Sequence, residues 1–253
     1  MRTFLRLPAL AGVLNTILRP LLLIQAGTPP DAIRAQVGDL PRWFGAAMDR
    51  DSQAFEIVRV FEGAPLPEPD VHRAAIITGS WSMVTDLHAW SEATADWIRR
   101  AVAINTPLFG VCYGHQLMAH ALGGKVGYHP RGREMGCMDI ERLPLAQTEP
   151  LLAGAPQRFK AHLTHLQTVV QLPAGAEVLA RSAHDPHQVV RYSPTAISTQ
   201  FHPEFTPAIS SACISTRRHV LREEGLDPTA MLSQLDDTPT PLLMLRRFVE
   251  AYA

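Results

Sequence analysis

The sequence lacks long hydrophobic runs and an excess of either charge. Its 253 residues include 23 Lys and Arg against 24 Asp and Glu, a formal net charge of -1. Without a positive excess the chain has no electrostatic basis for binding polyanions, which argues against a nucleic-acid partner. No run reaches the roughly 20 apolar residues that span a bilayer, so we expect no membrane partner.

Cysteine is scarce, and the three that are present, Cys112, Cys137 and Cys213, lie far apart in the sequence. An odd number of widely spaced cysteines is not a disulfide framework, and it favours reduced thiols in a cytoplasmic protein. The 11 histidines form no tract with the spacing of metal ligands. We therefore expect neither a metal nor another cofactor.

The N-terminal residues only faintly resemble a signal peptide. Arg2 and Arg6 precede the apolar run 7–14, but Pro8 interrupts the run early and no clear small-residue cleavage site follows. We interpret residues 1–19 as an N-terminal extension. No Gly/Ser-rich or charge-rich linker and no internal repeat divides the remainder, so residues 20–253 are predicted to form a single domain.

The first half of this domain alternates between apolar runs and amphipathic segments. Continuous apolar runs are typical of parallel strands covered on both faces. The predicted strands are 20–25, 54–60, 74–78 and 107–111, and the predicted helices are 31–48 and 88–104. The alternation predicts an α/β fold with a doubly wound, mostly parallel sheet and helices on both faces.

After about residue 124 the pattern changes to short β-like runs with no long amphipathic helix between them. Such runs predict hairpins and mixed strand pairing. They cover 125–128, 138–142, 158–162, 168–172, 177–181, 188–192 and 196–200, and helices follow at about 207–224 and 241–252.

A nucleophile elbow is the most informative local pattern. The strand at 107–111 runs into Gly110-Val-Cys-Tyr-Gly114, and an apolar helix follows at once. Glycines on both sides of Cys112 suit a sharp strand-to-helix turn, where neighbouring Cβ atoms would collide. The helix N-terminus favours the thiolate, and the N–H of Tyr113 is placed to stabilise an oxyanion. Cys112 is the predicted nucleophile.

A base for this nucleophile is predicted near residue 200, where a β run ends in Phe201-His-Pro-Glu-Phe205. A histidine and a carboxylate two residues apart can form the base and its orienting group. His202 and Glu204 therefore complete a Cys-His-Glu triad. His115, three residues after the nucleophile on the same helix, is interpreted as structural, and His120 as a packed helix residue.

These motifs together resemble class I glutamine amidotransferases. The resemblance covers roughly residues 20–205 and is closest to stand-alone, GMP-synthase-like members. Beside the two motifs already described, Ile77-Thr-Gly-Ser-Trp-Ser-Met-Val84 resembles the oxyanion loop of that family. Gly79 would then supply the second oxyanion N–H.

The resemblance implies a flavodoxin-like fold and a substrate site for glutamine or a γ-glutamyl compound. Gln116 would lie beside the amino-acid end of the substrate. One loop facing the substrate would hold Arg133, Glu134, Met135 and Gly136. The opposite wall would hold Thr164, His165 and Gln167.

One feature departs from synthetase-fused relatives: the chain contains no GxxxxGK[ST] phosphate loop and leaves no room for a second catalytic domain. Three interpretations stay open. The chain releases ammonia from glutamine for a synthetase partner protein, or it is a free-standing γ-glutamyl peptide hydrolase with the same triad. Alternatively, it is a non-catalytic regulatory protein on this fold, against which the intact triad and Gly79 argue.

Overall fold

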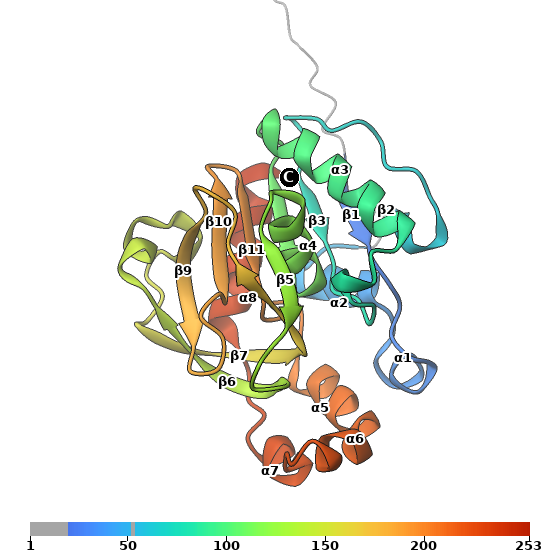
Figure 1. The fold of residues 1–253 in the computed structure, drawn as a ribbon, viewed down its shortest axis with the longest axis vertical. Helices are drawn as coiled ribbons and strands as arrows, with labels where there is room; N and C mark the ends of the chain where they lie inside the picture. Colours follow the sequence, from blue (N-terminus) through green and yellow to red (C-terminus); the bar gives the residue numbers. More distant parts are fainter. Residues whose placement is uncertain (1–19, 52–53) are drawn as a thin grey trace, which may run out of the picture.

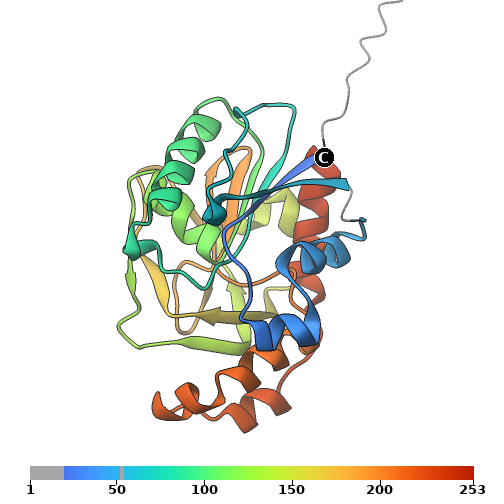
Figure 2. The same ribbon diagram turned by 90° about the vertical axis from the view of Figure 1, so that its right-hand side faces the viewer.

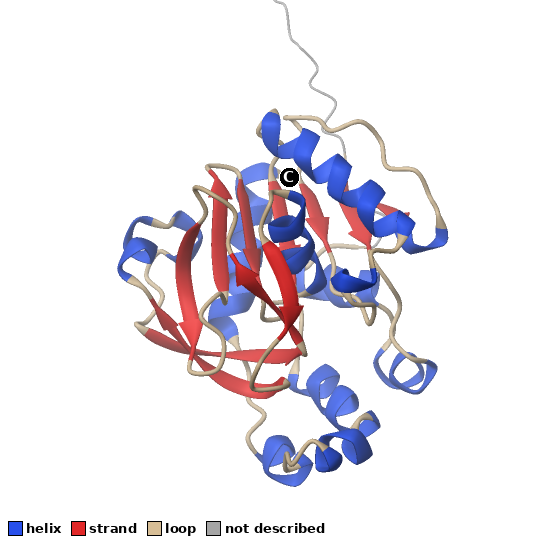
Figure 3. Ribbon diagram, viewed as in Figure 1, coloured by secondary structure: helices blue, strands red, loops and turns tan. Residues whose placement is uncertain are grey.

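The computed structural model describes residues 20–51 and 54–253, and the predicted extension at 1–19 lies outside them. Within this part a nine-stranded sheet has the order β2-β1-β3-β4-β11-β10-β9-β6-β7, and β5 and β8 form a separate two-stranded sheet. Helices lie on both faces of the large sheet (Figures 1 and 3).

The parallel part of the sheet confirms the predicted α/β core. It comprises β2 (Phe55–Arg59), β1 (Leu21–Gln25), β3 (Ala75–Ile77), β4 (Leu108–Val111) and β11 (Ala196–Thr199), each paired in parallel with its neighbour. These strands match the predicted runs to within a residue or so. Because all are parallel, β3, β4 and β11 present their carboxyl ends at one edge of the sheet.

The remaining strands pair antiparallel, as the change of sequence pattern predicted. They are β6 (Glu134–Arg142), β7 (Arg158–His165), β9 (Glu177–Ser182) and β10 (Val189–Ser193), with β5 (Lys125–Tyr128) and β8 (Gln167–Gln171) in the small sheet. β6 starts four residues earlier than predicted and β7 ends three residues later. Their register places Glu134 opposite His165.

Alternate residues of β1 face opposite hydrophobic layers. Leu21 and Leu23 pack in the layer that includes Phe248 of α8 (Pro239–Tyr252), whereas Leu22 packs in the layer that includes Leu117 of α4 (Tyr113–Ala121). Helix α2 (Leu40–Met48) joins the first layer, and α3 (Ala89–Ala103) joins the second. Burial on both faces is why β1, β3 and β4 read as continuous apolar runs, whereas the edge strand β2 is exposed at three of its five residues.

Two predicted helices are each divided into two. The segment predicted as one helix at 31–48 forms α1 (Asp31–Val37) and α2, because Gly38 adopts a φ of 85° and Asp39 caps α2. Pro41 also has no N–H to continue a helix from α1. The segment at 207–224 forms α5 (Pro207–Thr216) and α6 (Arg218–Glu223), which meet at Arg217.

A helical appendage follows the parallel core. Helices α5, α6 and α7 (Pro228–Ser233) gather at one end of the molecule, and α7 was not predicted (Figure 2). This appendage and α1 share a third apolar cluster that includes Ile33, Trp43, Met135 and Ile209. In the described part of the chain, no helix is both long enough and apolar enough to cross a membrane.

Helix α4 approaches β3 and β4 so closely that two glycines are required. A Cβ atom added at Gly114 would lie 2.4 Å from the carbonyl oxygen of Ile77, and one at Gly110 would lie 2.8 Å from the Gly114 carbonyl oxygen. Both distances are shorter than van der Waals contact, so a side chain at either position would push the helix away. The predicted role of the glycines flanking Cys112 is confirmed.

Replacing Gly114 with Ala should therefore destabilise the fold by about 1–3 kcal/mol, the usual effect of overpacking. Gly127→Ala is the matched control, because its added Cβ would meet Val170 at an ordinary 3.6 Å. Urea unfolding of both variants gives the two changes in unfolding free energy. Equal changes in the two variants would show that α4 can move away from β3 without cost.

Candidate active site

Cys112 occupies a strained turn between β4 and α4. It is the N-cap residue of α4 with a φ of 51° and a ψ of -98°, a conformation that side-chain-bearing residues rarely adopt. Its amide donates to the Thr199 carbonyl oxygen of β11 at 2.8 Å. The turn places the thiol at the helix N-terminus, where the backbone N–H groups favour negative charge.

His202 lies just beyond β11 and is held from three sides. Its Nδ1 donates to Glu204 Oε1 at 2.7 Å, and its ring stacks on Phe205 with 4.0 Å between centroids. Its backbone amide donates to the His162 carbonyl oxygen at 2.9 Å. The His202 and Glu204 side chains are buried, so the ring orientation is fixed within the protein interior.

The structure brings His202 and Cys112 next to each other. A Cβ atom added at Gly79 would lie 3.1 Å from His202 Cε1 and 3.7 Å from Cys112 Cβ, so both residues border the same point. The Nε2 atom of His202 has no hydrogen-bond partner among the described residues. It is therefore the free ring nitrogen on the side of the thiol.

The charges of this pair stabilise each other. Burial raises the pKa of Cys112, but the charge and contact of His202, with a further contribution from His165, bring it below the ordinary thiol value. Burial lowers the pKa of His202, but Glu204 and Cys112 outweigh it and raise the value to about 10. These shifts favour the thiolate form of Cys112 and the imidazolium form of His202 over the neutral pair.

Gly79 and Tyr113, the predicted oxyanion donors, both border this pair. Gly79 follows β3, and a Cβ atom there would make a tight 3.1 Å contact with His202 Cε1. Tyr113 is the first residue of α4, so its N–H has no acceptor within the helix. Its phenol is occupied elsewhere, in a 2.6 Å hydrogen bond with Ser91.

A cavity opens beside Cys112. Of the predicted substrate-binding residues, Gln116, Arg133, Thr164, His165 and Gln167 line it. It is also lined by Leu166, which lies within the predicted wall between His165 and Gln167, by residues 80–83 of the predicted oxyanion loop, and by Arg217. The sequence assigned residues 80–83 to the oxyanion loop without a role in binding substrate, and it did not indicate Arg217.

Three predicted substrate-binding residues do not line this cavity. Glu134, Met135 and Gly136 begin strand β6 and do not form a loop. Met135 packs in the apolar cluster beneath the helical appendage, and Gly136, at a φ of 113°, faces Met231 of α7. Glu134 is buried behind the wall of the cavity. Strand pairing with β7 therefore draws these residues away from the predicted loop.

Gln116 contributes less to the cavity than predicted. Its amide nitrogen donates to the Gln167 carbonyl oxygen at 2.7 Å and to Gln200 Oε1 at 2.9 Å. These two bonds use both amide hydrogens, so only the carboxamide oxygen remains for a substrate.

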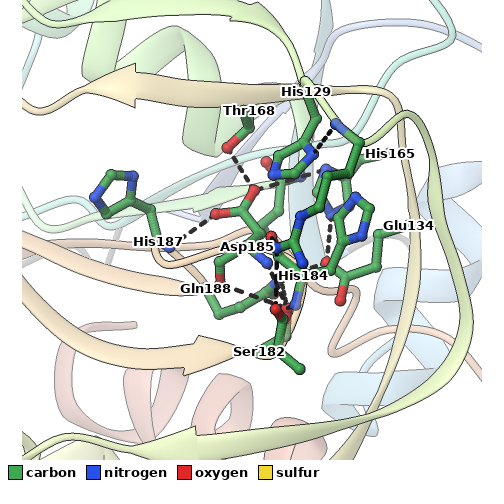
Figure 4. Close-up of polar contacts among 12 residues, drawn as sticks. His129, Glu134, His165, Thr168, Ser182, His184, Asp185, His187 and Gln188 are labelled. Carbon is green, nitrogen blue, oxygen red and sulfur yellow. Dashed lines mark hydrogen bonds and ion pairs between the residues drawn. The ribbon is translucent and has the colours of Figure 1, made fainter.

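A buried polar network lies behind the cavity and fixes His165 (Figure 4). His165 Nε2 contacts Glu134 Oε2 at 2.9 Å, and Nδ1 contacts the Gln167 carbonyl oxygen at 2.9 Å. Both partners are acceptors, so both ring nitrogens carry protons. Burial lowers the pKa of His165, but Glu134 and Asp185 raise it above the ordinary value. The surroundings of His165 thus favour a second buried imidazolium near Cys112.

The carboxylates of this network are themselves held in place. Glu134 Oε2 also accepts from Gln188 Nε2 at 2.9 Å. Asp185 accepts from the Thr168 hydroxyl and from the His187 amide. None of these partners was selected from the sequence, because they come from separate strands and show no local motif.

The two helix histidines do not act as bases in this arrangement. His115 is fully buried, contacts Ser198 Oγ at 2.7 Å, and has a pKa lowered by burial to about 3. It is neutral and structural, as predicted. His120 contacts Glu92 of α3 at 2.9 Å and is partly exposed. The described residues hold no cluster of three side chains suited to a metal ion.

Comparison with known sequences identifies the family of this site. The glutamine amidotransferase class-I family model matches residues 71–216. Glutamine-hydrolyzing GMP synthase of Thermomicrobium roseum is 44% identical over 98 residues, 39% of this chain and 18% of that protein. One subunit of the glutamine-hydrolyzing GMP synthase of Pyrococcus abyssi is 36% identical over 101 residues, 40% of this chain and 52% of that protein. The chain thus spans about half or less of the length of these relatives.

Solved structures share the fold. A glutamine amidotransferase from Thermotoga maritima matches with a TM-score of 0.72 at 19% identity, over 92% of this chain and 97% of that one. One from Methylobacillus flagellatus matches with a TM-score of 0.70 at 22% identity, over 93% and 96%. With the family model matching more than half of its length, the chain belongs to the class I glutamine amidotransferase family.

Proposed function

We propose that the chain hydrolyses the γ-carboxamide of glutamine and releases ammonia, with Cys112 as nucleophile, His202 as acid and base, and Glu204 as its orienting group. The observation that carries this proposal is the position of Cys112, in a strained turn at a helix N-terminus, beside the hydrogen-bonded His202 and Glu204. The lowered pKa of Cys112 and the raised pKa of His202 favour the thiolate that attacks and the imidazolium that protonates the leaving nitrogen.

In the first half of the reaction, the Cys112 sulfur forms a bond to the γ-carbon of glutamine. The carbonyl oxygen becomes an oxyanion, which the N–H groups of Gly79 and Tyr113 stabilise. His202 Nε2 gives its proton to the nitrogen of the tetrahedral intermediate. The carbon–nitrogen bond then breaks, ammonia leaves, and a γ-glutamyl thioester remains on Cys112.

In the second half, neutral His202 takes a proton from water as the water oxygen attacks the thioester. The tetrahedral intermediate collapses, the carbon–sulfur bond breaks, and glutamate leaves. The thiolate and imidazolium are restored. One glutamine and one water give one glutamate and one ammonia, with no net change in the enzyme.

The His165 imidazolium assists this cycle electrostatically. It favours the Cys112 thiolate without competing for the proton, because Glu134 and the Gln167 carbonyl oxygen hold both of its N–H groups. In this account His165 is a positioning and electrostatic residue, and His202 alone transfers protons.

The relatives support an acceptor on a second protein. The Pyrococcus abyssi relative is named as one subunit of a glutamine-hydrolyzing GMP synthase, so that enzyme divides its parts between chains. By analogy, the ammonia released here would be used by a synthetase partner, which would raise the glutaminase rate on binding. Purification of the tagged chain from its native cells, followed by comparison of its rate with that of the isolated chain, tests this. An equal rate would argue against the partner.

Cys112 should be the only cysteine that reacts quickly with iodoacetamide near neutral pH. Burial raises the pKa of Cys137 and raises that of Cys213 to about 11, so both stay protonated. Peptide mass spectrometry after brief alkylation measures the three sites. Cys112→Ala should remove both the fast labelling and the turnover. Comparable labelling of Cys137 or Cys213 would contradict the assignment.

Glu204→Gln should move the alkaline limb of the pH–rate profile to lower pH. Glu204 raises the pKa of His202, which stands at about 10, so removing its charge lowers that pKa. The His202 imidazolium, which protonates the leaving nitrogen, then loses its proton at a lower pH. Opposite charges at such distances shift pKa values by roughly 1–3 units. If the alkaline limb of kcat/KM did not move, Glu204 would not be the group that raises the pKa of His202.

The substrate class is tested by steady-state release of ammonia or amine from glutamine and from γ-glutamyl dipeptides. Blocking the α-amino or α-carboxylate group should lower kcat/KM, because a site built to pair these groups leaves polar atoms unsatisfied without them. Faster turnover of the dipeptides than of glutamine would favour a γ-glutamyl peptide hydrolase. Equal rates for blocked and free substrates would indicate a general cysteine amidase.

A further inference from the structure

Several polar atoms in the wall of the active-site cavity are buried and lack a hydrogen-bond partner among the described residues. They are Arg217 Nη1, Trp81 Nε1 and Thr164 Oγ1. All three residues line the cavity that contains Cys112. Two of the three atoms can only donate, so together they form a surface suited to an acceptor with negative charge.

Arg217 reaches this cavity from the helical appendage. It is the residue between α5 and α6, one position beyond the 71–216 segment that the family model matches. Its guanidinium carbon lies 5.7 Å from the ring centroid of Trp81, and its side chain contacts the Cys213 thiol. The aromatic face and the thiol orient the guanidinium group, but neither carries a negative charge to neutralise it.

Arg217 lacks the carboxylate partner that other buried or partly buried arginines have. Arg73 pairs with Glu56 at 2.6 Å, and the Arg191 Nε donates to Glu149 at 2.6 Å. Arg133, the neighbour of Arg217, makes a two-point pair with Glu224 at 2.8 and 3.0 Å. In residues 20–51 and 54–253, no carboxylate forms an ion pair with Arg217.

The surroundings also oppose the charge of Arg217. Burial lowers its pKa, and the positive charge of Arg133 adds to that effect, while Cys213 and Cys112 offset it only in part. A purely structural side chain at this junction could be apolar and avoid both penalties. The position instead retains a permanent cation facing a cavity, which is the arrangement expected of a receptor for an anion.

We propose that Arg217 binds the α-carboxylate of the γ-glutamyl substrate, with Trp81 Nε1 and Thr164 Oγ1 as additional donors. This inference rests on the proposed function. Glutamine carries one carboxylate and its reacting γ-carboxamide is neutral, so the α-carboxylate is the only negative charge that the substrate brings to Arg217. The appendage thereby contributes a specificity residue to a site otherwise built from the parallel core.

The test compares glutamine with its α-amide, in which the carboxylate is replaced by a neutral carboxamide, in the wild type and in Arg217→Met. The products, glutamate and glutamate α-amide, are quantified directly. The wild type should prefer glutamine by on the order of 10²-fold or more in kcat/KM, as expected for an unpaired buried charge. Arg217→Met should lose most of this preference through a higher KM for glutamine, with little change for the α-amide.

Arg218→Met is the matched control, since this exposed neighbour lies at the same helix junction and does not line the cavity. It should retain the wild-type preference. Arg217→Lys should recover part of it, because Lys keeps the charge without the planar pair of donors. If Arg217→Met slows both substrates equally, or leaves the preference intact, the proposal is overturned and Arg217 is structural.

A second readout needs no turnover. Glutamate should protect Cys112 from iodoacetamide in the wild type and in Arg218→Met, while Arg217→Met should need a much higher glutamate concentration. If protection depends on Arg217 but no substrate is turned over, the carboxylate site is supported and the proposed function is contradicted. If substrate is turned over but protection does not depend on Arg217, the proposed function is supported and the carboxylate site is contradicted. An absence of protection in the wild type would overturn the carboxylate site.

Discussion

The close approach of α4 to β3 is the constraint on which the rest of the site depends. Gly114 allows the helix to lie against the Ile77 carbonyl oxygen, where a Cβ atom would come within 2.4 Å. That approach forces a sharp turn, and the turn holds Cys112 at a positive φ. The thiol consequently faces the carboxyl ends of β3 and β11, which carry Gly79 and His202. A less compact helix would separate the nucleophile from both.

The charges of the site are set by carboxylates that contact the histidines and not the thiol. Glu204 and Glu134 each contact a histidine, and these contacts favour the imidazolium form of His202 and His165 near Cys112. Burial alone would keep the thiol protonated, and it would also discharge isolated histidines. The site therefore requires the acids as much as the bases. The five-residue motif 201–205 is therefore not enough to set the charges of the site. The network from β6, β7 and the loop before β10 is needed as well.

The sequence predicted the features that depend on local geometry. Glycines two residues on either side of Cys112 indicate the elbow because each has a steric role within the same turn. The central parallel strands were evident because both of their faces are buried. The break of the helix at Gly38 was not predicted, since the apolar spacing continues across it. The pattern indicates which face is buried but not the interruption of the helix at Gly38 and Asp39.

Features that depend on pairing between distant segments could not be read from the sequence. Glu134 was expected in a loop facing the substrate, but its partner across the β6–β7 register is His165, so it joins a strand and a buried ion pair. Arg217 was missed for a similar reason. It lies in an apparently continuous helix, and only the packing of α5 against the core turns it toward Trp81 and the cavity.

The most direct measurement of the central claim is detection of the acyl-enzyme. The protein is mixed with glutamine, quenched in acid within the first turnovers, and digested for peptide mass spectrometry. The account predicts a γ-glutamyl group on the peptide that contains Cys112, and the adduct should disappear on return to neutral pH. Continued ammonia release with no adduct, or an adduct on another residue, would contradict Cys112 as the nucleophile.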